Sequence, residues 1–114
     1  MPRVARSIVA PPISFPYRAG HFSELQYLFD LSSITLKGTP DMTGAQQALG
    51  KQMRAYWANF ARTGNPSGKG VPAWTQFEEA KAGPVQSLNK PQSRSVTNFA
   101  SEHQCDFWKT IERK

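Results

Sequence analysis

The sequence predicts a fold made mostly of helices and loops with few short strands, and three observations support this class. An apolar stripe at helical spacing, bounded by capping residues, predicts one long helix over residues 43–64. Nine prolines and eight glycines among 114 residues place much of the remaining length in turns and loops. After the long helix, only residues 85–88 and 95–99 have the composition of short strands. A core built from these elements is expected to be thin.

The predicted long helix has one apolar face and a signal at each end. Thr43 and Gln46 form a capping box at the start, in which each side chain accepts from the other's backbone N–H. Gly64 supplies the left-handed residue that ends helices, Pro66 follows it, and Arg62 lies in the last turn, where a cation is favourable. A helix of this length spans about 30 Å and needs a large surface to cover its stripe. The stripe consists of Leu49, Met53, Tyr56, Trp57 and Phe60.

The segments before the long helix are predicted from capping residues and prolines. Ser23 and Gln26 make a second capping pattern ahead of apolar residues at helical spacing, which predicts a helix of one or two turns. Residues 1–20 contain four prolines and are predicted as a loop that holds at most a short strand at Val4–Val9. Residues 32–40 are predicted to connect the two helices.

The segments after the long helix are predicted to return to it and then close with a second helix. Turn formers fill residues 65–72, and Trp74 and Phe77 are expected to cover the end of the long helix. A Lys90–Pro91 turn separates the two strand candidates. Residues 101–111 are predicted as one helix whose apolar residues recur every third position, at Cys105, Trp108 and Ile111.

Charge and composition argue against several classes of partner. The formal net charge is +6, but the basic side chains are scattered up to the 109–114 tail, so we expect solvated surface and no nucleic-acid partner. A small basic binding protein is a weaker alternative. No apolar run approaches the roughly 18 residues of a membrane span, and the N-terminus lacks the apolar segment of a signal peptide, so the chain as written is expected in the cytosol. Cys105, the single cysteine, cannot form an internal disulfide.

The side chains that could bind a metal or a cofactor form no recognisable pattern. The candidate ligands are His21, His103, Cys105 and Asp106. Only His103 and Cys105 are close in sequence as a possible pair, and the spacing matches no zinc motif. The Gly-Lys-Gly turn at 68–70 lacks the frame of a phosphate-binding loop. We therefore expect neither a metal nor a cofactor.

His21 is the one side chain with the context of a catalytic residue. It follows Gly20 in the loop that opens the first predicted helix, a place where catalytic groups are often displayed. A lone histidine is otherwise more often a packed or surface residue. No G-x-S-x-G nucleophile elbow occurs in the chain, so Ser67 is interpreted as a turn residue and Ser23 as a helix cap. Glu24 is expected to serve the helix N-terminus.

Three stretches of the chain together resemble the C-terminal end of the type-B carboxylesterases, the cholinesterase-like branch of the α/β-hydrolases. They are AGHFSELQYLFDL, QQALGKQMRAYWANFARTGNPSGKGVPAW and FASEHQCDFW, in the order and spacing of that family. The resemblance runs from about Pro11 to Trp108, and its most specific part is Y-W-x-N-F-A-R-T-G-x-P with a following P-x-W. The family usually has glycine where this chain has Arg18 and a small residue where it has Phe22.

The resemblance implies an α/β fold, of which residues 1–114 are a partial, C-terminal portion of a carboxylesterase type-B domain. In the family, the histidine of an A-x-H-x-x-E-L motif is the catalytic acid-base of a Ser-His-acid triad, and His21 holds that place here. The family's serine, oxyanion-hole glycines and acidic residue lie upstream of the matching region. The resemblance therefore implies part of a serine carboxylic-ester hydrolase that acts on a small-molecule ester when complete and is inactive alone.

A non-catalytic interpretation stays open, because cholinesterase-like domains also occur as adhesion or binding modules that have lost the triad. The upstream serine would decide between the two. A partial domain that exposes its apolar stripe is also expected to be marginally stable, since little burial opposes the entropy of ordering the chain.

Overall fold

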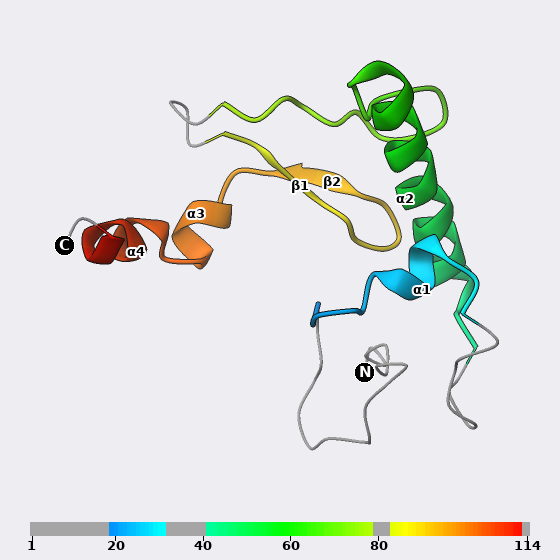
Figure 1. Cartoon of the computed structure of the whole chain (residues 1–114), viewed down its shortest axis with the longest axis horizontal. Helices are drawn as coiled ribbons and strands as arrows, with labels where there is room; N and C mark the ends of the chain where they lie inside the picture. Colours follow the sequence, from blue (N-terminus) through cyan, green and yellow to red (C-terminus); the bar gives the residue numbers. More distant parts are fainter. Residues whose placement is uncertain (1–18, 32–40, 79–82, 113–114) are drawn as a thin grey trace.

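The computed structural model describes residues 19–31, 41–78 and 83–112 (Figure 1). Its elements in chain order are helices α1 at Leu25–Leu28 and α2 at Gly44–Thr63, strands β1 at Val85–Ser87 and β2 at Arg94–Val96, and helices α3 at Phe99–Glu102 and α4 at Cys105–Glu112. The prediction of helices and loops with few short strands is confirmed for this part of the chain. The loop and strand predicted over residues 1–18 and the connector over 32–40 lie outside the described residues.

Helix α2 begins and ends at the residues that the sequence predicted. Thr43 Oγ1 accepts a hydrogen bond from the Gln46 N–H at 3.3 Å, and Gln46 Oε1 accepts from the Thr43 N–H at 2.7 Å. Gly64 has a left-handed φ of 74° and donates its N–H to the Phe60 carbonyl at 2.8 Å. Arg62 lies in the last turn. The capping box and the glycine stop are therefore both confirmed.

The apolar stripe of α2 is buried along only part of its length. Leu49, Met53 and Tyr56 are buried and form the apolar core of the described residues. Trp57 is 46% exposed and Phe60 is 60% exposed, although both belong to the same stripe. The half of the stripe toward the C-terminal end of α2 thus lacks a covering surface among the described residues.

One of the two aromatic residues that return toward α2 covers it, and the other does not. Trp74 packs edge-to-face on Tyr56, with ring centroids 5.1 Å apart and planes at 88°. Such a pair adds about 0.5–1.5 kcal/mol beyond the area that it buries. Phe77 is 60% exposed. The predicted cover is confirmed for Trp74 and is wrong for Phe77.

Strands β1 and β2 form an antiparallel hairpin that is fastened to α2 by polar contacts. Val85 pairs with Val96 and Ser87 with Arg94. The second strand was predicted over residues 95–99, but it ends at Val96 because α3 begins shortly afterwards. The hairpin meets α2 where the Ser93 N–H donates to Gln52 Oε1 at 3.3 Å.

The buried Gln86 makes a second link between the hairpin and α2. Its Nε2 donates to the Tyr56 hydroxyl at 3.2 Å, and that hydroxyl donates to the Pro72 carbonyl at 2.7 Å. Tyr56 therefore joins the helix, the hairpin and the loop after the helix through one side chain.

Helix α1 is a single turn that begins later than its predicted cap. The cap residue is Glu24, whose side chain makes no capping hydrogen bond. Gln26 Nε2 instead donates to the Ser23 carbonyl at 3.2 Å. The capping pattern predicted for Ser23 and Gln26 is therefore wrong. Glu24 lies at the helix N-terminus as expected, but its side chain makes no hydrogen bond there. The reason is that backbone turns, with Ser23 N–H donating to Gly20 O and Leu25 N–H to Phe22 O, already precede the helix.

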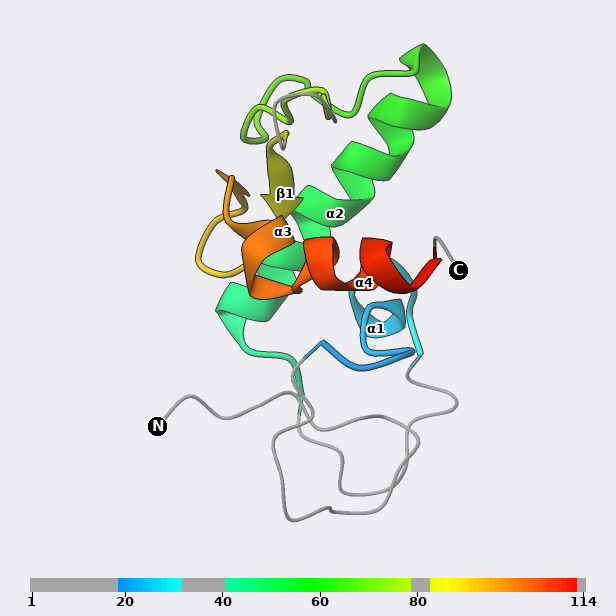
Figure 2. The ribbon, with the colours of Figure 1, turned by 90° about the vertical axis from the view of Figure 1, so that its left-hand side faces the viewer.

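The single helix predicted over residues 101–111 is two helices, α3 and α4. Gln104 separates them with a left-handed φ of 52°, which a right-handed helix cannot accommodate. His103 ends α3, where its ring stacks on Phe99 at a centroid distance of 4.0 Å. Figure 1 places α3 and α4 beyond the hairpin and away from α2, and Figure 2, seen from their side, shows them in front of it.

Many large apolar side chains are exposed among the described residues. The radius of gyration is 16.6 Å, whereas a compact domain of about 100 residues has about 13 Å. No helix among the described residues is long and apolar enough to cross a membrane. The thin core agrees with the expected marginal stability. The large apolar side chains that are at least 40% exposed are Phe22, Phe29, Trp57, Phe60, Phe77, Phe99, Phe107, Trp108 and Ile111.

The stability of the chain is expected to fall above pH 10 because of Tyr56. Burial raises the pKa of the Tyr56 hydroxyl above its ordinary value, and the hydrogen bond from Gln86 lowers it in part. A raised folded-state pKa favours the protonated phenol, so this contribution to stability is complete below pH about 10 and is lost as pH rises through the folded pKa. Urea unfolding between pH 7 and pH 11 measures the loss.

Two tyrosine variants test this assignment. Tyr56→Phe is expected to cost about 1–2 kcal/mol at pH 7, because two hydrogen-bond partners lose the hydroxyl, and to reduce the alkaline decline. Tyr27→Phe is the matched control, and the alkaline decline in stability should remain in this variant. A decline of equal size in the Tyr56→Phe variant would refute the role of this hydroxyl.

Candidate functional site

His21 lies in the turn that leads into α1, as predicted, and its side chain is exposed. The Ser23 N–H donates to the Gly20 carbonyl at 3.1 Å and closes the turn beneath it. No carboxylate or hydroxyl among the described residues hydrogen bonds to the imidazole. The imidazole is therefore accessible to a partner group, and the described residues supply neither a nucleophile nor an orienting acid.

Phe22 follows His21 with an unusual backbone conformation. Its φ is 70°, in the left-handed region that is a genuine outlier for a bulky residue. Its ring meets the His21 ring edge-on, with centroids 4.4 Å apart and planes at 76°. Both side chains are exposed. The left-handed conformation of residue 22 explains why a small residue suits the position.

Helix α1, and with it the turn of His21, is held on α2 at Gly50 and Arg54. The Arg54 Nη1 donates to the Tyr27 carbonyl at 2.6 Å. A Cβ added at Gly50 would lie 3.0 Å from the same carbonyl oxygen. Neither residue is predicted from the sequence as part of the site. The one signal for them was an isolated glycine inside a helical pattern, which usually has a packing reason.

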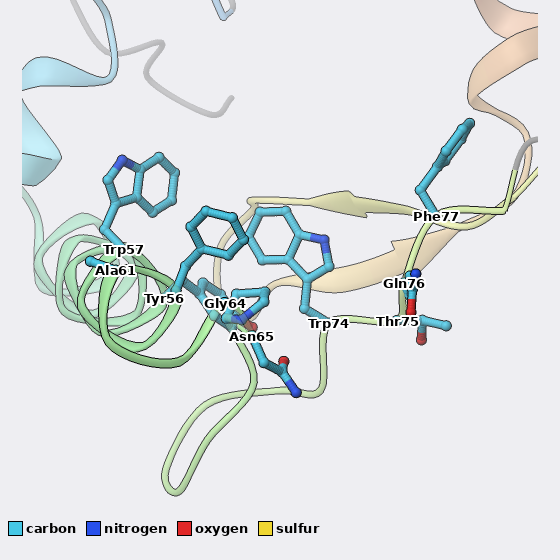
Figure 3. Close-up of a pocket in the computed structure, with 11 residues that line it drawn as sticks. Tyr56, Trp57, Ala61, Gly64, Asn65, Trp74, Thr75, Gln76 and Phe77 are labelled. Atoms are coloured by element: carbon cyan, nitrogen blue, oxygen red, sulfur yellow. The ribbon is translucent and has the colours of Figure 1, made fainter.

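An aromatic groove of about 890 Å³ lies between the C-terminal half of α2 and the segment after it (Figure 3). Trp57 stands on the helix side and Phe77 on the extended segment at the opposite side. Among the described residues that line the groove, the polar side chains are amides and hydroxyls together with the Trp indoles, and the rest are apolar. Its main lining side chains are Tyr56, Trp57, Phe60, Asn65, Trp74 and Phe77.

The loop between α2 and Trp74, residues 64–74, is fixed by side chains that bond to its backbone. Ser67 Oγ accepts from the Trp74 N–H at 2.9 Å and donates to the Trp74 carbonyl at 3.2 Å. Asn59 Nδ2 donates to the Pro66 carbonyl at 3.1 Å, and Asn65 Oδ1 accepts from the Ser67 N–H at 2.9 Å. The interpretation of Ser67 as a turn residue is confirmed.

The residues considered as metal ligands are not brought together in the described part of the chain. No group of three or more His, Cys, Asp or Glu side chains there could hold a metal ion. His103 Nδ1 lies 2.9 Å from the Phe99 carbonyl, which assigns that ring to the end of α3. Cys105 is a free, half-buried thiol at the start of α4.

Comparison with known proteins identifies the family of the chain. The model of the carboxylesterase family matches residues 3–108. Among curated relatives, carboxylesterase 5A of Felis catus is 36% identical over 95 residues, which cover 80% of this chain and 16% of the relative. Cocaine esterase of Homo sapiens is 34% identical over 92 residues, or 81% of this chain and 15% of the relative. Carboxylesterase 3B of Mus musculus is 39% identical over 66 residues, or 54% of this chain and 12% of the relative.

The chain thus spans about one sixth of the length of the curated relatives that it matches. The match includes the turn of His21, helix α2, the hairpin and the first half of α4. The carboxylesterase family is a family of α/β-hydrolases, as the resemblance implied. The chain belongs to the carboxylesterase family.

Proposed function

We propose that the chain is the C-terminal part of a serine carboxylic-ester hydrolase and that His21 is its catalytic acid-base. In this proposal residues 1–114 are one partial domain, and the serine nucleophile and the acidic triad member come from the rest of the hydrolase. The substrate is a small carboxylic ester. The isolated chain is inactive, because nothing among its described residues can be activated by the imidazole.

The observation that carries the proposal is the display of His21. The imidazole is exposed on a turn at the start of a helix that is itself seated on α2, and the family match extends across this turn. His103, the other histidine, is instead engaged with Phe99 by stacking and by its Nδ1. Of the two imidazoles, His21 has neither ring nitrogen hydrogen bonded to another described residue, so both of its nitrogens are open to groups supplied by another segment.

The chemistry follows from the ability of an imidazole to change charge near neutral pH. His21 accepts the proton of the serine hydroxyl as the serine oxygen attacks the ester carbonyl carbon. It then returns the proton to the leaving alkoxide, the alcohol departs, and an acyl-enzyme remains. Water then attacks the acyl carbon while His21 takes one of the water protons. The bond from the acyl carbon to the serine oxygen breaks, His21 returns the proton to that oxygen, and the acid is released.

A chimera tests the proposal. The matching segment of the human relative is replaced by this chain, and the truncated relative without the segment serves as the control. We expect the chimera to hydrolyse 4-nitrophenyl acetate and to become labelled at its serine by a fluorophosphonate, whereas the truncated relative does neither. The 114-residue chain added in trans to the truncated relative is a second arm for a chimera that does not fold.

The outcomes separate an enzyme from a binding module. Labelling and hydrolysis in either arm support the catalytic role of the segment. A chimera that melts cooperatively but neither hydrolyses the ester nor reacts with the fluorophosphonate would contradict it, and would favour a non-catalytic cholinesterase-like module.

A further inference from the structure

We propose that Gly50 and Arg54 are positioning residues for His21, a role that rests on the function proposed above. They lie one turn apart on the same face of α2, and both meet the Tyr27 carbonyl of α1. We call these two residues the α1 seat. The seat joins the turn that carries His21 to the longest helix of the described residues.

Arg54 supplies the attractive part of the seat. Its Nη1 donates to the Tyr27 carbonyl oxygen at 2.6 Å, a short distance that is typical of hydrogen bonds from a charged donor. Tyr27 lies in the last turn of α1. Carbonyl groups in the last turn of a helix accept no hydrogen bond from an N–H of the same helix. Arg54 therefore gives this carbonyl the partner that a one-turn helix cannot provide.

Gly50 supplies the space for the seat. A Cβ at this position would lie 3.0 Å from the Tyr27 oxygen, 3.2 Å from Arg54 Nη1 and 3.5 Å from the Tyr27 Cα. Any other residue would therefore require the α1 backbone or the guanidinium that bonds to it to move by a few tenths of an ångström. Glycine is otherwise unfavourable inside a helix, so its presence at this buried position has a packing reason.

Helix α1 is short and only half-buried, so its position depends on its contact with α2. It is four residues long, it has no side-chain cap and none of its residues is fully buried. A helix of this length does not form alone in water. The backbone turns at Gly20–Ser23 and Phe22–Leu25 connect α1 directly to His21. A shift of α1 is therefore passed to the imidazole, and misplacing a catalytic group by about 1 Å can cost about 100-fold in rate.

Amide hydrogen exchange of the 114-residue chain tests the seat without any assay of activity. In Arg54→Gln, the Tyr27 and Phe29 amides are expected to exchange about tenfold faster, as the loss of one charged hydrogen bond predicts. The amides around Met53 should keep their rate. Arg62→Gln is the matched control, because Arg62 lies on the same helix and donates to Asn59 within it rather than to α1.

Gly50→Ala tests whether the space at residue 50 matters. This variant is expected to stabilise α2 while it loosens α1. Alanine favours the helix, so α2 should not be weakened, while the Tyr27 and Phe29 amides should again exchange faster because α1 is displaced. Faster exchange of α1 and α2 together in both variants would indicate general destabilisation and would overturn the proposal. Unchanged exchange of α1 in both variants would overturn it as well.

The chimera described above gives the catalytic readout. Arg54→Gln is expected to lower kcat about tenfold while KM for a small ester stays the same, and Arg54→Lys should recover part of the loss because it keeps the charge. If α1 loosens but kcat does not change, positioning is refuted while the proposed function stands. If the parent chimera melts cooperatively but is inactive, the proposed function fails, and the exchange experiment still decides whether the seat holds α1.

Discussion

Replacing His21 with glutamine in the chimera is expected to lower kcat by about 10⁴-fold or more, because loss of the histidine disables a triad almost as fully as loss of the serine does. Glutamine keeps a polar side chain of similar reach but cannot take up a proton. KM for 4-nitrophenyl acetate should change little, since the imidazole acts on the serine proton rather than on the bound ester. Steady-state kinetics and the rate of fluorophosphonate labelling measure the loss.

His103→Gln is the matched control for this experiment, because the chain contains two histidines and both are exposed. His103 closes α3 and faces Phe99, so its loss is expected to leave kcat unchanged. Retention of full activity in His21→Gln would eliminate the proposed acid-base. An equal loss in both histidine variants would point to folding rather than to catalysis.

Replacing Tyr56 with alanine is expected to abolish the ordered structure around α2. Truncation of a buried aromatic residue typically costs about 3–5 kcal/mol, whereas the whole stability of a domain is only about 5–15 kcal/mol. Tyr56 is 1% exposed, packs on Trp74 and joins three segments through its hydroxyl. Its removal therefore takes away packing and the polar links at the same time. Circular dichroism at 222 nm during a titration with a stabilising osmolyte measures the change.

Trp57→Ala provides the comparison at the next position of the same helix. Trp57 is larger than Tyr56 but is 46% exposed, so its loss is expected to cost about 1 kcal/mol or less. A greater osmolyte requirement for Tyr56→Ala than for Trp57→Ala is the expected result. Similar requirements for the two variants would mean that the core does not centre on Tyr56.

The parts of the fold that the sequence predicted correctly are those determined by neighbouring residues. The start and stop of α2 depend on Thr43, Gln46 and Gly64, whose side chains or backbone act within one or two turns. The break at Gln104 and the left-handed Phe22 have no such local signal, because neither residue type favours a positive φ. Both were therefore missed.

The site was predictable to a similar extent. The place of His21 on a turn before a helix follows from Gly20 and from the adjacent apolar pattern. Its support was not predictable, because Arg54 lies 27 positions from Tyr27 and no periodicity links them. Met53 is buried whereas Phe60 is exposed, although both belong to the same stripe. This difference depends on which surfaces surround each end of α2, and the spacing of the apolar residues does not determine those surfaces.

The hydrogen bonds that fix the loop at residues 64–74 have a consequence for the aromatic groove beside it. Asn59 and Tyr56 of α2 bond to the Pro66 and Pro72 carbonyls of the loop, and Ser67 bonds to both backbone groups of Trp74. One wall of the groove is thus fixed by its own hydrogen bonds. A group that contacts this wall therefore has little loop backbone to order.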